Sequence, residues 1–140
     1  MHVPALLVAG AMVAVAFIPR AAHAQNGRDS TARAASLYTA EQASRGEQVY
    51  RRICVECHET LEYTGSEFRA KWNGRPAFEL FDLIRSTMPE EAPGSLTAQQ
   101  YADVLAYMMK LNAVAPGQTP LPTDTDALKK LKLDIPAPRR

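Results

Sequence analysis

The stretch Cys54-Val55-Glu56-Cys57-His58 constrains this chain more than any other part of its sequence. Two cysteines three positions apart, followed at once by a histidine, are typical of covalent haem attachment. The two thiols can add to the vinyl groups along one edge of a porphyrin, and the histidine can then present its imidazole to the iron. The motif therefore predicts one covalent haem c, with thioethers at Cys54 and Cys57 and with His58 as an axial iron ligand.

Other uses of the two cysteines are weaker. Cys54 and Cys57 are the only 2 cysteines of the chain, and a disulfide between them would close a very small ring that joins nothing distant. A thiol–disulfide enzyme would need a βαβ context around the motif, and the surrounding sequence lacks one. The other histidines, His2 and His23, fall in a predicted export signal, so a bis-histidine haem and a Cys2His2 zinc site are excluded for the mature chain.

The N-terminus is typical of a secretory signal. Residues 3–18 carry no charge, and Ala22-His23-Ala24 provides a small-residue cleavage site, although no Lys or Arg precedes the apolar run. The run is shorter than the roughly 20 residues of a spanning helix, so a retained membrane anchor is the weaker alternative. We expect a signal peptide at residues 1–24, cleaved after Ala24, which places the mature protein in the periplasm or otherwise outside the cytoplasm, with no membrane span.

Length, composition and charge limit the number of domains and the classes of partner. The chain has 140 residues, 46% of them apolar, and a formal net charge of +1, so no bulk charge indicates nucleic acid as a partner. We expect a flexible lead-in at residues 25–38, one domain at residues 39–117 and a proline-rich tail at residues 118–140. Residues 126–133 are expected to form one short helix with Leu128 and Leu131 pointing inward, and the tail either wraps the domain or stays mobile.

Helical periodicity predicts an all-α domain. The first helix begins at Thr39, where Gln42 stands at capping-box spacing, and ends at the cysteine motif. The last helix begins at Thr97, with Gln100 at the same spacing, and ends near Asn112. Apolar residues recur on one face of each helix. These faces comprise Ala43, Gly46, Tyr50 and Ile53 in the first helix, and Tyr101, Val104, Leu105, Met108 and Leu111 in the last.

Two shorter helices are expected between them, and each carries a candidate site residue. Ser66 caps the first, which bears Trp72, a candidate donor to a haem propionate through its indole N–H. The second begins at Pro76 and ends near Arg85-Ser86. Met88 follows it, off any helical stripe and before a proline that favours extended backbone. Its thioether is a soft ligand for haem iron, and we expect it, rather than Met108 or Met109, to be the second axial ligand.

These features together resemble a class I c-type cytochrome, a small bacterial monohaem cytochrome c. The resemblance covers about residues 39–117. It rests on Gly46-x-x-x-Tyr50-x-x-x-Cys54, on the haem motif, on Thr87-Met88-Pro89 and on Asp103-Val104-Leu105-Ala106-Tyr107. It implies three to five helices wrapped around one covalent haem, with the N- and C-terminal helices crossing where Gly46 and Tyr50 pack near Val104 and Tyr107.

One departure from the family concerns the haem histidine. Many members place a proline soon after this histidine, in a region whose carbonyl orients the imidazole, but no proline lies between His58 and Pro76 here. We expect another backbone carbonyl to accept the hydrogen bond of the imidazole N–H.

The resemblance implies a one-electron carrier rather than an enzyme. Its partners would be a dehydrogenase as donor and an oxidase or other acceptor in a respiratory or quinoprotein pathway, bound only transiently. A haem-based sensor or a ligand-binding subunit of a larger redox complex is the alternative, and would need a displaceable Met88. A haem enzyme of sulfur chemistry is a further alternative, although the mature chain has no cysteine or histidine outside the haem motif to serve as a ligand or nucleophile.

Overall fold

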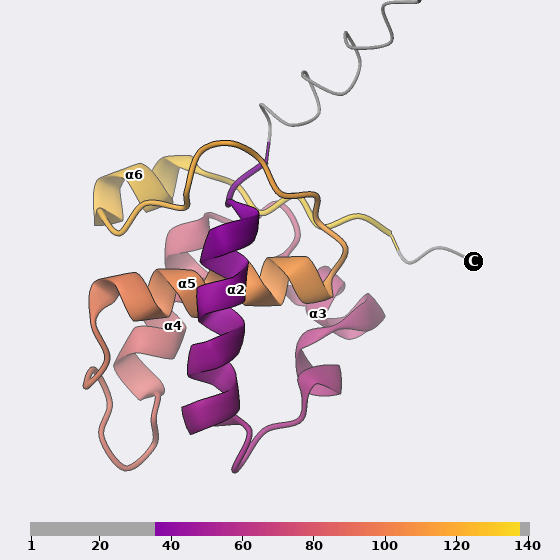
Figure 1. The fold of residues 1–140 in the computed structure, drawn as a ribbon. Helices are drawn as coiled ribbons and strands as arrows, with labels where there is room; N and C mark the ends of the chain where they lie inside the picture. The colour runs from indigo at the N-terminus through magenta and orange to yellow at the C-terminus, as the bar shows by residue number, and fades with distance from the viewer. Residues whose placement is uncertain (1–35, 138–140) are drawn as a thin grey trace, which may run out of the picture.

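The computed structural model describes residues 36–137, so the predicted signal peptide and most of the lead-in lie outside the described residues. The described chain is helical, with two isolated β-bridges, and this confirms the all-α prediction (Figure 1). Short turns, the π-helical η1 and the 3-10 helical η2, follow the first helix. The elements are α2 (Ala40–Val49), η1 (Tyr50–Cys54), η2 (Thr60–Tyr63), α3 (Gly65–Trp72), α4 (Ala77–Thr87), α5 (Ala98–Leu111) and α6 (Thr125–Lys130).

Helices α2 and α5 cross in close contact, as expected for the N- and C-terminal helices of the domain (Figure 1). Gly46 of α2 lies directly on the backbone of α5, where a Cβ atom would stand 1.8 Å from the carbonyl oxygen of Asp103 and 3.0 Å from the Cβ of Tyr107. The next turn adds an aromatic contact, because the rings of Tyr50 and Tyr107 lie 5.4 Å apart. The glycine therefore sets the distance between the two helices.

Substitution of Gly46 by alanine tests this contact. Alanine normally favours a helix over glycine by about 1 kcal/mol, but here its methyl group would overlap a backbone atom that cannot move without separating the helices. We expect Gly46→Ala to lower the free energy of unfolding by about 3 kcal/mol or more, measured by chemical denaturation of the haem-loaded protein. Gln48→Ala, at an exposed position of the same helix, should have almost no effect. Equal stability of the two variants would contradict the close-packing argument.

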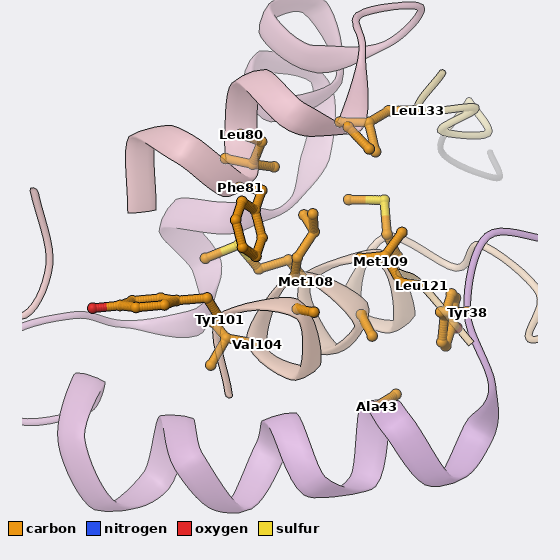
Figure 2. Close-up of a cluster of buried hydrophobic side chains, with 14 of the residues drawn as sticks. Tyr38, Ala43, Leu80, Phe81, Tyr101, Val104, Met108, Met109, Leu121 and Leu133 are labelled. Carbon is orange, nitrogen blue, oxygen red and sulfur yellow. The ribbon is translucent and has the colours of Figure 1, made fainter. Parts of the chain in front are cut away.

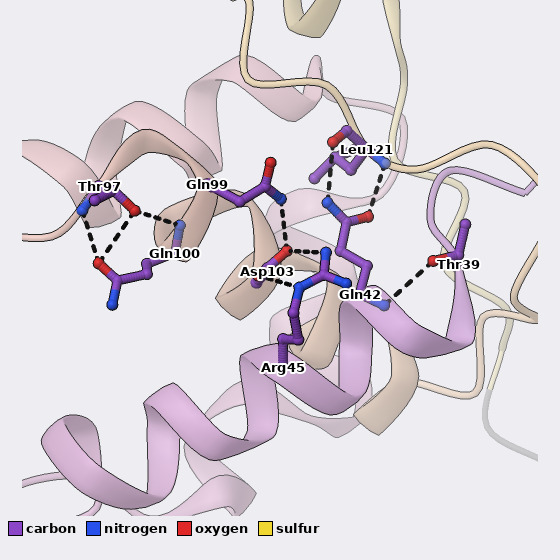
Figure 3. Close-up of polar contacts among 8 residues, drawn as sticks. All are labelled: Thr39, Gln42, Arg45, Thr97, Gln99, Gln100, Asp103 and Leu121. Carbon is purple, nitrogen blue, oxygen red and sulfur yellow. Dashed lines mark hydrogen bonds and ion pairs between the residues drawn. The ribbon is translucent and has the colours of Figure 1, made fainter.

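Capping explains where the two long helices begin (Figure 3). Thr97 and Gln100 form the predicted capping box at the start of α5. At the start of α2 the Thr39 side chain accepts a hydrogen bond from the Gln42 N–H at 3.2 Å, as predicted. The Gln42 side chain, however, does not complete a box. It bonds to the backbone of Leu121 instead, donating to its carbonyl at 3.0 Å and accepting from its N–H at 2.7 Å.

The C-terminal segment wraps the domain. Four of its apolar side chains, each at most 2% exposed, are part of the core: Leu121, Leu128, Leu133 and Ile135. The backbone is fastened to the loop before α4, since Gly74 N–H donates to the Leu133 carbonyl at 2.7 Å and Leu133 N–H to the Arg75 carbonyl at 2.9 Å. Of the two states left open by the sequence, residues 118–137 therefore adopt the wrapped one.

Several helix boundaries differ from their predictions by a few residues. Helix α6 is shorter than predicted, and only Leu128 of its expected inward pair is fully buried. Helix α3 begins at Gly65 after an N-cap at Thr64, so the prediction that Ser66 caps it was wrong. Pro76 is the N-cap of α4 rather than its first residue. The residue that precedes each of these helices has a non-helical backbone, with ψ of 170° at Thr64, 135° at Pro76 and 128° at Asp124.

Helix α5 lies at the centre of the core, with every residue from 101 to 109 buried (Figure 2). The predicted apolar face accounts for only part of this burial. The remaining positions are covered by α2 and by the C-terminal segment, which packs Leu121 and Leu133 into the same cluster as Met109. The helix therefore holds a fixed position from which its side chains can orient other segments.

A buried carboxylate also joins the crossing helices (Figure 3). Asp103 of α5 is 3% exposed. It accepts two hydrogen bonds from the Arg45 guanidinium of α2, at 2.9 and 3.0 Å, and one from the Gln99 amide at 2.7 Å. Two parallel hydrogen bonds of this kind add geometric specificity to an ion pair, so they help to fix the rotation of α2 about its axis relative to α5.

An exposed ion pair at the other end of the crossing should make stability pH-dependent. Glu47 of α2 binds Lys110 of α5 at 2.9 Å and Arg51 at 2.8 Å. Lys110 first, and then Arg51, lower the pKa of Glu47 below its ordinary value of 4.5. Because the folded-state pKa is lowered, the unfolded chain binds more protons in acid. The stabilisation is present above pH 4.5 and is lost as the pH falls through the folded-state pKa.

We therefore expect Glu47→Gln to be less stable than the wild type by about 0.5 kcal/mol at neutral pH and low salt. The difference should disappear as the pH falls below the Glu47 pKa. Denaturation midpoints of both proteins across this pH range provide the measurement. A difference that stays constant down to the lowest pH would show that the carboxylate charge is not its cause.

Candidate haem site

The cysteine motif is placed by a widened helical turn. After α2, the chain continues as η1, in which the Val55 N–H donates to the Tyr50 carbonyl at 3.1 Å, five residues back. The carbonyl of Cys54 then accepts hydrogen bonds from the N–H groups of Cys57, at 3.2 Å, and His58, at 3.0 Å. This tight turn holds both cysteines, neither of them in a disulfide, beside the histidine at one cavity.

The cavity has a volume of about 610 Å³, which is in the range of roughly 300–1,000 Å³ that cofactor sites occupy. Its wall comes from η1, η2, α3, α4, α5 and the loop between α4 and α5, and it is predominantly apolar. The apolar lining includes Ile53, Phe68, Trp72, Leu80, Leu83, Ile84, Leu96, Val104 and Met108. Cys54, Cys57, His58 and Met88 all line this same cavity. The structure thus brings together every site residue that the sequence predicted.

His58 is oriented by a carboxylate. Its Nδ1 lies 3.1 Å from Oε2 of Glu62, on the next turn of the chain. The bond to His58, and then the Glu59 N–H, lower the pKa of Glu62, so this side chain is ionised at neutral pH. The prediction that a backbone carbonyl would accept this bond was wrong, because η2 brings Glu62 back toward the histidine. The contact through Nδ1 leaves Nε2 available to bind iron.

Hydrogen bonds from buried tyrosines hold the backbone of this segment and of the Met88 segment. The Tyr50 hydroxyl donates to the carbonyl of His58 at 2.9 Å, and the Tyr101 hydroxyl donates to the carbonyl of Met88 at 2.7 Å. Met88 itself ends α4, where its N–H donates to Ile84 at 2.9 Å and a cis peptide bond joins it to Pro89. Neither tyrosine bond was evident in the sequence, since each joins residues that no periodic pattern relates.

The other two methionines differ in position. Met108 lines the cavity from α5, whereas Met109 is fully buried on another side of the helix and does not line the cavity. Met108 is therefore the alternative sulfur ligand that an experiment has to distinguish from Met88.

Trp72 lines the cavity near its basic neighbours. It is 5% exposed at the end of α3. The Lys71 ammonium lies 5.2 Å and the Arg75 guanidinium 5.0 Å from the centre of its ring. Positive charge beside an indole N–H suits a propionate, and this interaction remains a prediction. Lys71 and Arg75 lie close to Trp72 in the sequence, and this proximity was the signal that could have added both to the candidate propionate contacts.

The environment of the cysteines does not favour thiol chemistry. Burial raises the pKa of the Cys54 thiol, which disfavours the thiolate, the nucleophilic form of cysteine. Redox-active CxxC pairs have lowered thiol pKa values instead. Burial of Cys54 therefore disfavours the bare-thiol alternative.

An apolar cavity of this size, with two unpaired thiols and a histidine and a methionine on its wall, fits a covalently attached haem. Residues 41–108 match the protein family described as Cytochrome C oxidase, cbb3-type, subunit III. The chain contains a class I cytochrome c domain. It is an electron-transfer protein rather than an enzyme, and its Cys54/Cys57 motif implies haem c. No curated protein and no solved structure shows a significant match to the chain.

The surface around the cytochrome site has an uneven charge. Among the residues that line the cavity, four carboxylates, Glu62, Glu67, Glu90 and Glu91, stand against one basic side chain, Lys71. Val55, Leu61 and Leu83 are apolar and exposed. Within residues 36–137, no helix has the length and apolar character needed to cross a membrane.

Proposed function

We propose that this cytochrome carries single electrons outside the cytoplasm, with His58 and Met88 as the two axial ligands of its haem iron. The supporting observation is that both side chains line the cavity that also receives Cys54 and Cys57. Two thioethers would fix the cofactor, and two protein ligands would leave no open position on the iron. Such a site exchanges electrons without binding a substrate.

The chain's own residues would favour the reduced state in two ways. A thioether ligand raises the reduction potential of haem iron, and apolar side chains around the site limit access of water to it. Leu80 of α4 lines the cavity and is almost fully buried, as is the adjacent Phe81. Trp72, with Lys71 and Arg75 next to it, is the proposed contact for a propionate.

The proposed partners are redox proteins that bind transiently, a dehydrogenase as donor and an oxidase or another acceptor. Exposed Val55, at 52% exposure, follows the first cysteine and would lie near the accessible edge of the haem. The acidic lining of the cavity favours a partner with basic side chains at its docking surface. The predicted signal peptide, residues 1–24, supports an extracytoplasmic location for these encounters.

A haem-based sensor, or a ligand-binding subunit of a larger redox complex, is the alternative function. It requires the sulfur ligand to leave the iron readily so that a small molecule can bind. The two functions therefore differ in one measurable property, the strength of the bond between Met88 and the iron.

Substitution of Met88 tests the ligation. We expect the protein, matured with a haem-attachment system, to show a c-type reduced spectrum and a far-red sulfur–iron band in the oxidised form. The band should be absent from Met88→Ala and retained in Met108→Leu, because only the first substitution removes the proposed ligand. Optical spectra of all three proteins provide the measurement. The ferrous wild type should not bind carbon monoxide at neutral pH, whereas Met88→Ala should.

Three results would argue otherwise. Loss of the band in Met108→Leu alone would assign the ligand to α5. Carbon monoxide binding by the wild type would favour the sensor function. Absence of covalent haem would remove the basis of both.

Substitution of Glu62 tests the second proposed ligand, His58. A carboxylate that accepts the Nδ1–H bond makes the imidazole a more basic ligand and stabilises ferric iron. We expect Glu62→Gln to raise the reduction potential by on the order of 50 mV, close to a tenfold change in a one-electron equilibrium. Redox titration of the haem provides the measurement.

The matched control for Glu62→Gln is Glu67→Gln. Glu67 also lines the cavity, so its substitution removes the same charge from the same surface without touching His58. A smaller increase is expected. Equal increases in the two variants would attribute the effect to net charge rather than to the hydrogen bond.

A further inference from the structure

Residues 88–96 connect α4 to the start of α5 and contain the proposed sulfur ligand. Within this loop the hydrogen bonds are local, from Ala92 N–H to the Pro89 carbonyl at 3.0 Å and from Ser95 N–H to the Ala92 carbonyl at 3.2 Å. The Met88 N–H also joins the start of the loop to the end of α4, through the Ile84 carbonyl at 2.9 Å. None of these bonds attaches the loop to α5, so that attachment must come from elsewhere.

The Tyr101 hydroxyl provides that attachment. It donates to the Met88 carbonyl at 2.7 Å and lies 3.4 Å from the Leu96 N–H, from which it accepts. Met88 and Leu96 are the two ends of the loop. Among the hydrogen bonds of residues 36–137, these are the only ones that join the loop to α5.

The tyrosine is itself held rigidly. Its side chain is 1% exposed, and its ring packs edge-on against Phe81 at 6.3 Å between ring centres. Figure 2 shows the ring beside Phe81, with the hydroxyl pointing out of the buried cluster. A fixed ring with a projecting hydroxyl can hold a loop end in place without moving with it.

We propose that Tyr101 is a positioning residue that keeps Met88 on the haem iron by fastening both ends of the loop to α5. This inference rests on the proposed ligation by Met88. The other ligand has an analogous bond, since the Tyr50 hydroxyl donates to the His58 carbonyl at 2.9 Å. The His58 segment, however, is also tethered through the thioethers of Cys54 and Cys57. The Met88 segment contains no residue that would be covalently attached to the haem, so its dependence on a tyrosine hydroxyl is greater.

The test measures how easily imidazole displaces the sulfur from the ferric protein. Imidazole is added to wild type, Tyr101→Phe, Tyr50→Phe and Tyr38→Phe, and loss of the far-red band is followed. Phenylalanine retains the buried ring and removes only the hydroxyl. We expect imidazole to bind Tyr101→Phe about tenfold more tightly than the wild type, the change that loss of about one hydrogen bond produces. Tyr50→Phe should change its affinity by a smaller factor.

Tyr38→Phe is the matched control for stability. Its hydroxyl also donates from a 1%-exposed ring to a backbone carbonyl, that of Val114, at 2.6 Å. Tyr38 does not line the cavity. It should lower the thermal midpoint of the haem-loaded protein about as much as Tyr101→Phe does, yet leave imidazole affinity at the wild-type value.

Wild-type affinity in Tyr101→Phe, or an equal increase in Tyr38→Phe, would overturn the inference, since the hydroxyl would then contribute only stability. Failure of the proposed ligation is seen separately, as absence of the far-red band from the wild type or its survival in Met88→Ala. If Tyr101→Phe matures without the far-red band while Met88 is intact, the ligand has been released altogether, which supports the positioning role.

Discussion

The contact between Gly46 and the backbone of Asp103 is the constraint on which the rest of the structure depends. Because a Cβ atom there would stand 1.8 Å from the Asp103 oxygen, the two helices can approach only where α2 has a glycine. The ion pair between Arg45 and Asp103 then sets the rotation of α2 about its axis. Once these two contacts are made, α5 has a fixed position at the centre of the core. The segments that pack against α5 are then also fixed in position relative to the cysteine motif.

The cavity follows from that arrangement. Helix α2 and its π-helical continuation bring the cysteine motif to the wall, α4 brings Met88, and α5 supplies Val104 and Met108. The C-terminal segment packs against a different part of the core, where Gln42 fastens it through two hydrogen bonds to Leu121. It therefore contributes stability to the scaffold and leaves the cavity accessible from the surface.

Polar groups around the proposed ligands act mainly through orientation. Glu62 contacts the ring of His58, while the hydroxyls of Tyr50 and Tyr101 contact the backbone of the two ligand segments. Contacts of this kind orient the ligands, and they would thereby influence both the reduction potential of the haem iron and the strength of its bond to each ligand. Glu62 would thus tune the reduction potential, whereas Tyr50 and Tyr101 would hold the two ligand segments in place.

The sequence alone determined the haem motif, the helical class, the capping of α5 by Thr97 and Gln100, and the candidate set of Cys54, Cys57, His58 and Met88, because each depends on residues close together in the chain. It could not predict that Glu62 binds His58, that Gln42 bonds to Leu121 rather than completing a cap, or that Tyr101 holds the Met88 loop. Local spacing restricts which bonds are feasible, but the choice among them depends on which partners folding brings within reach. Burial of α5 on nearly all sides was hidden for the same reason: its second face is covered by a segment that follows it in the chain and returns only in the tertiary structure.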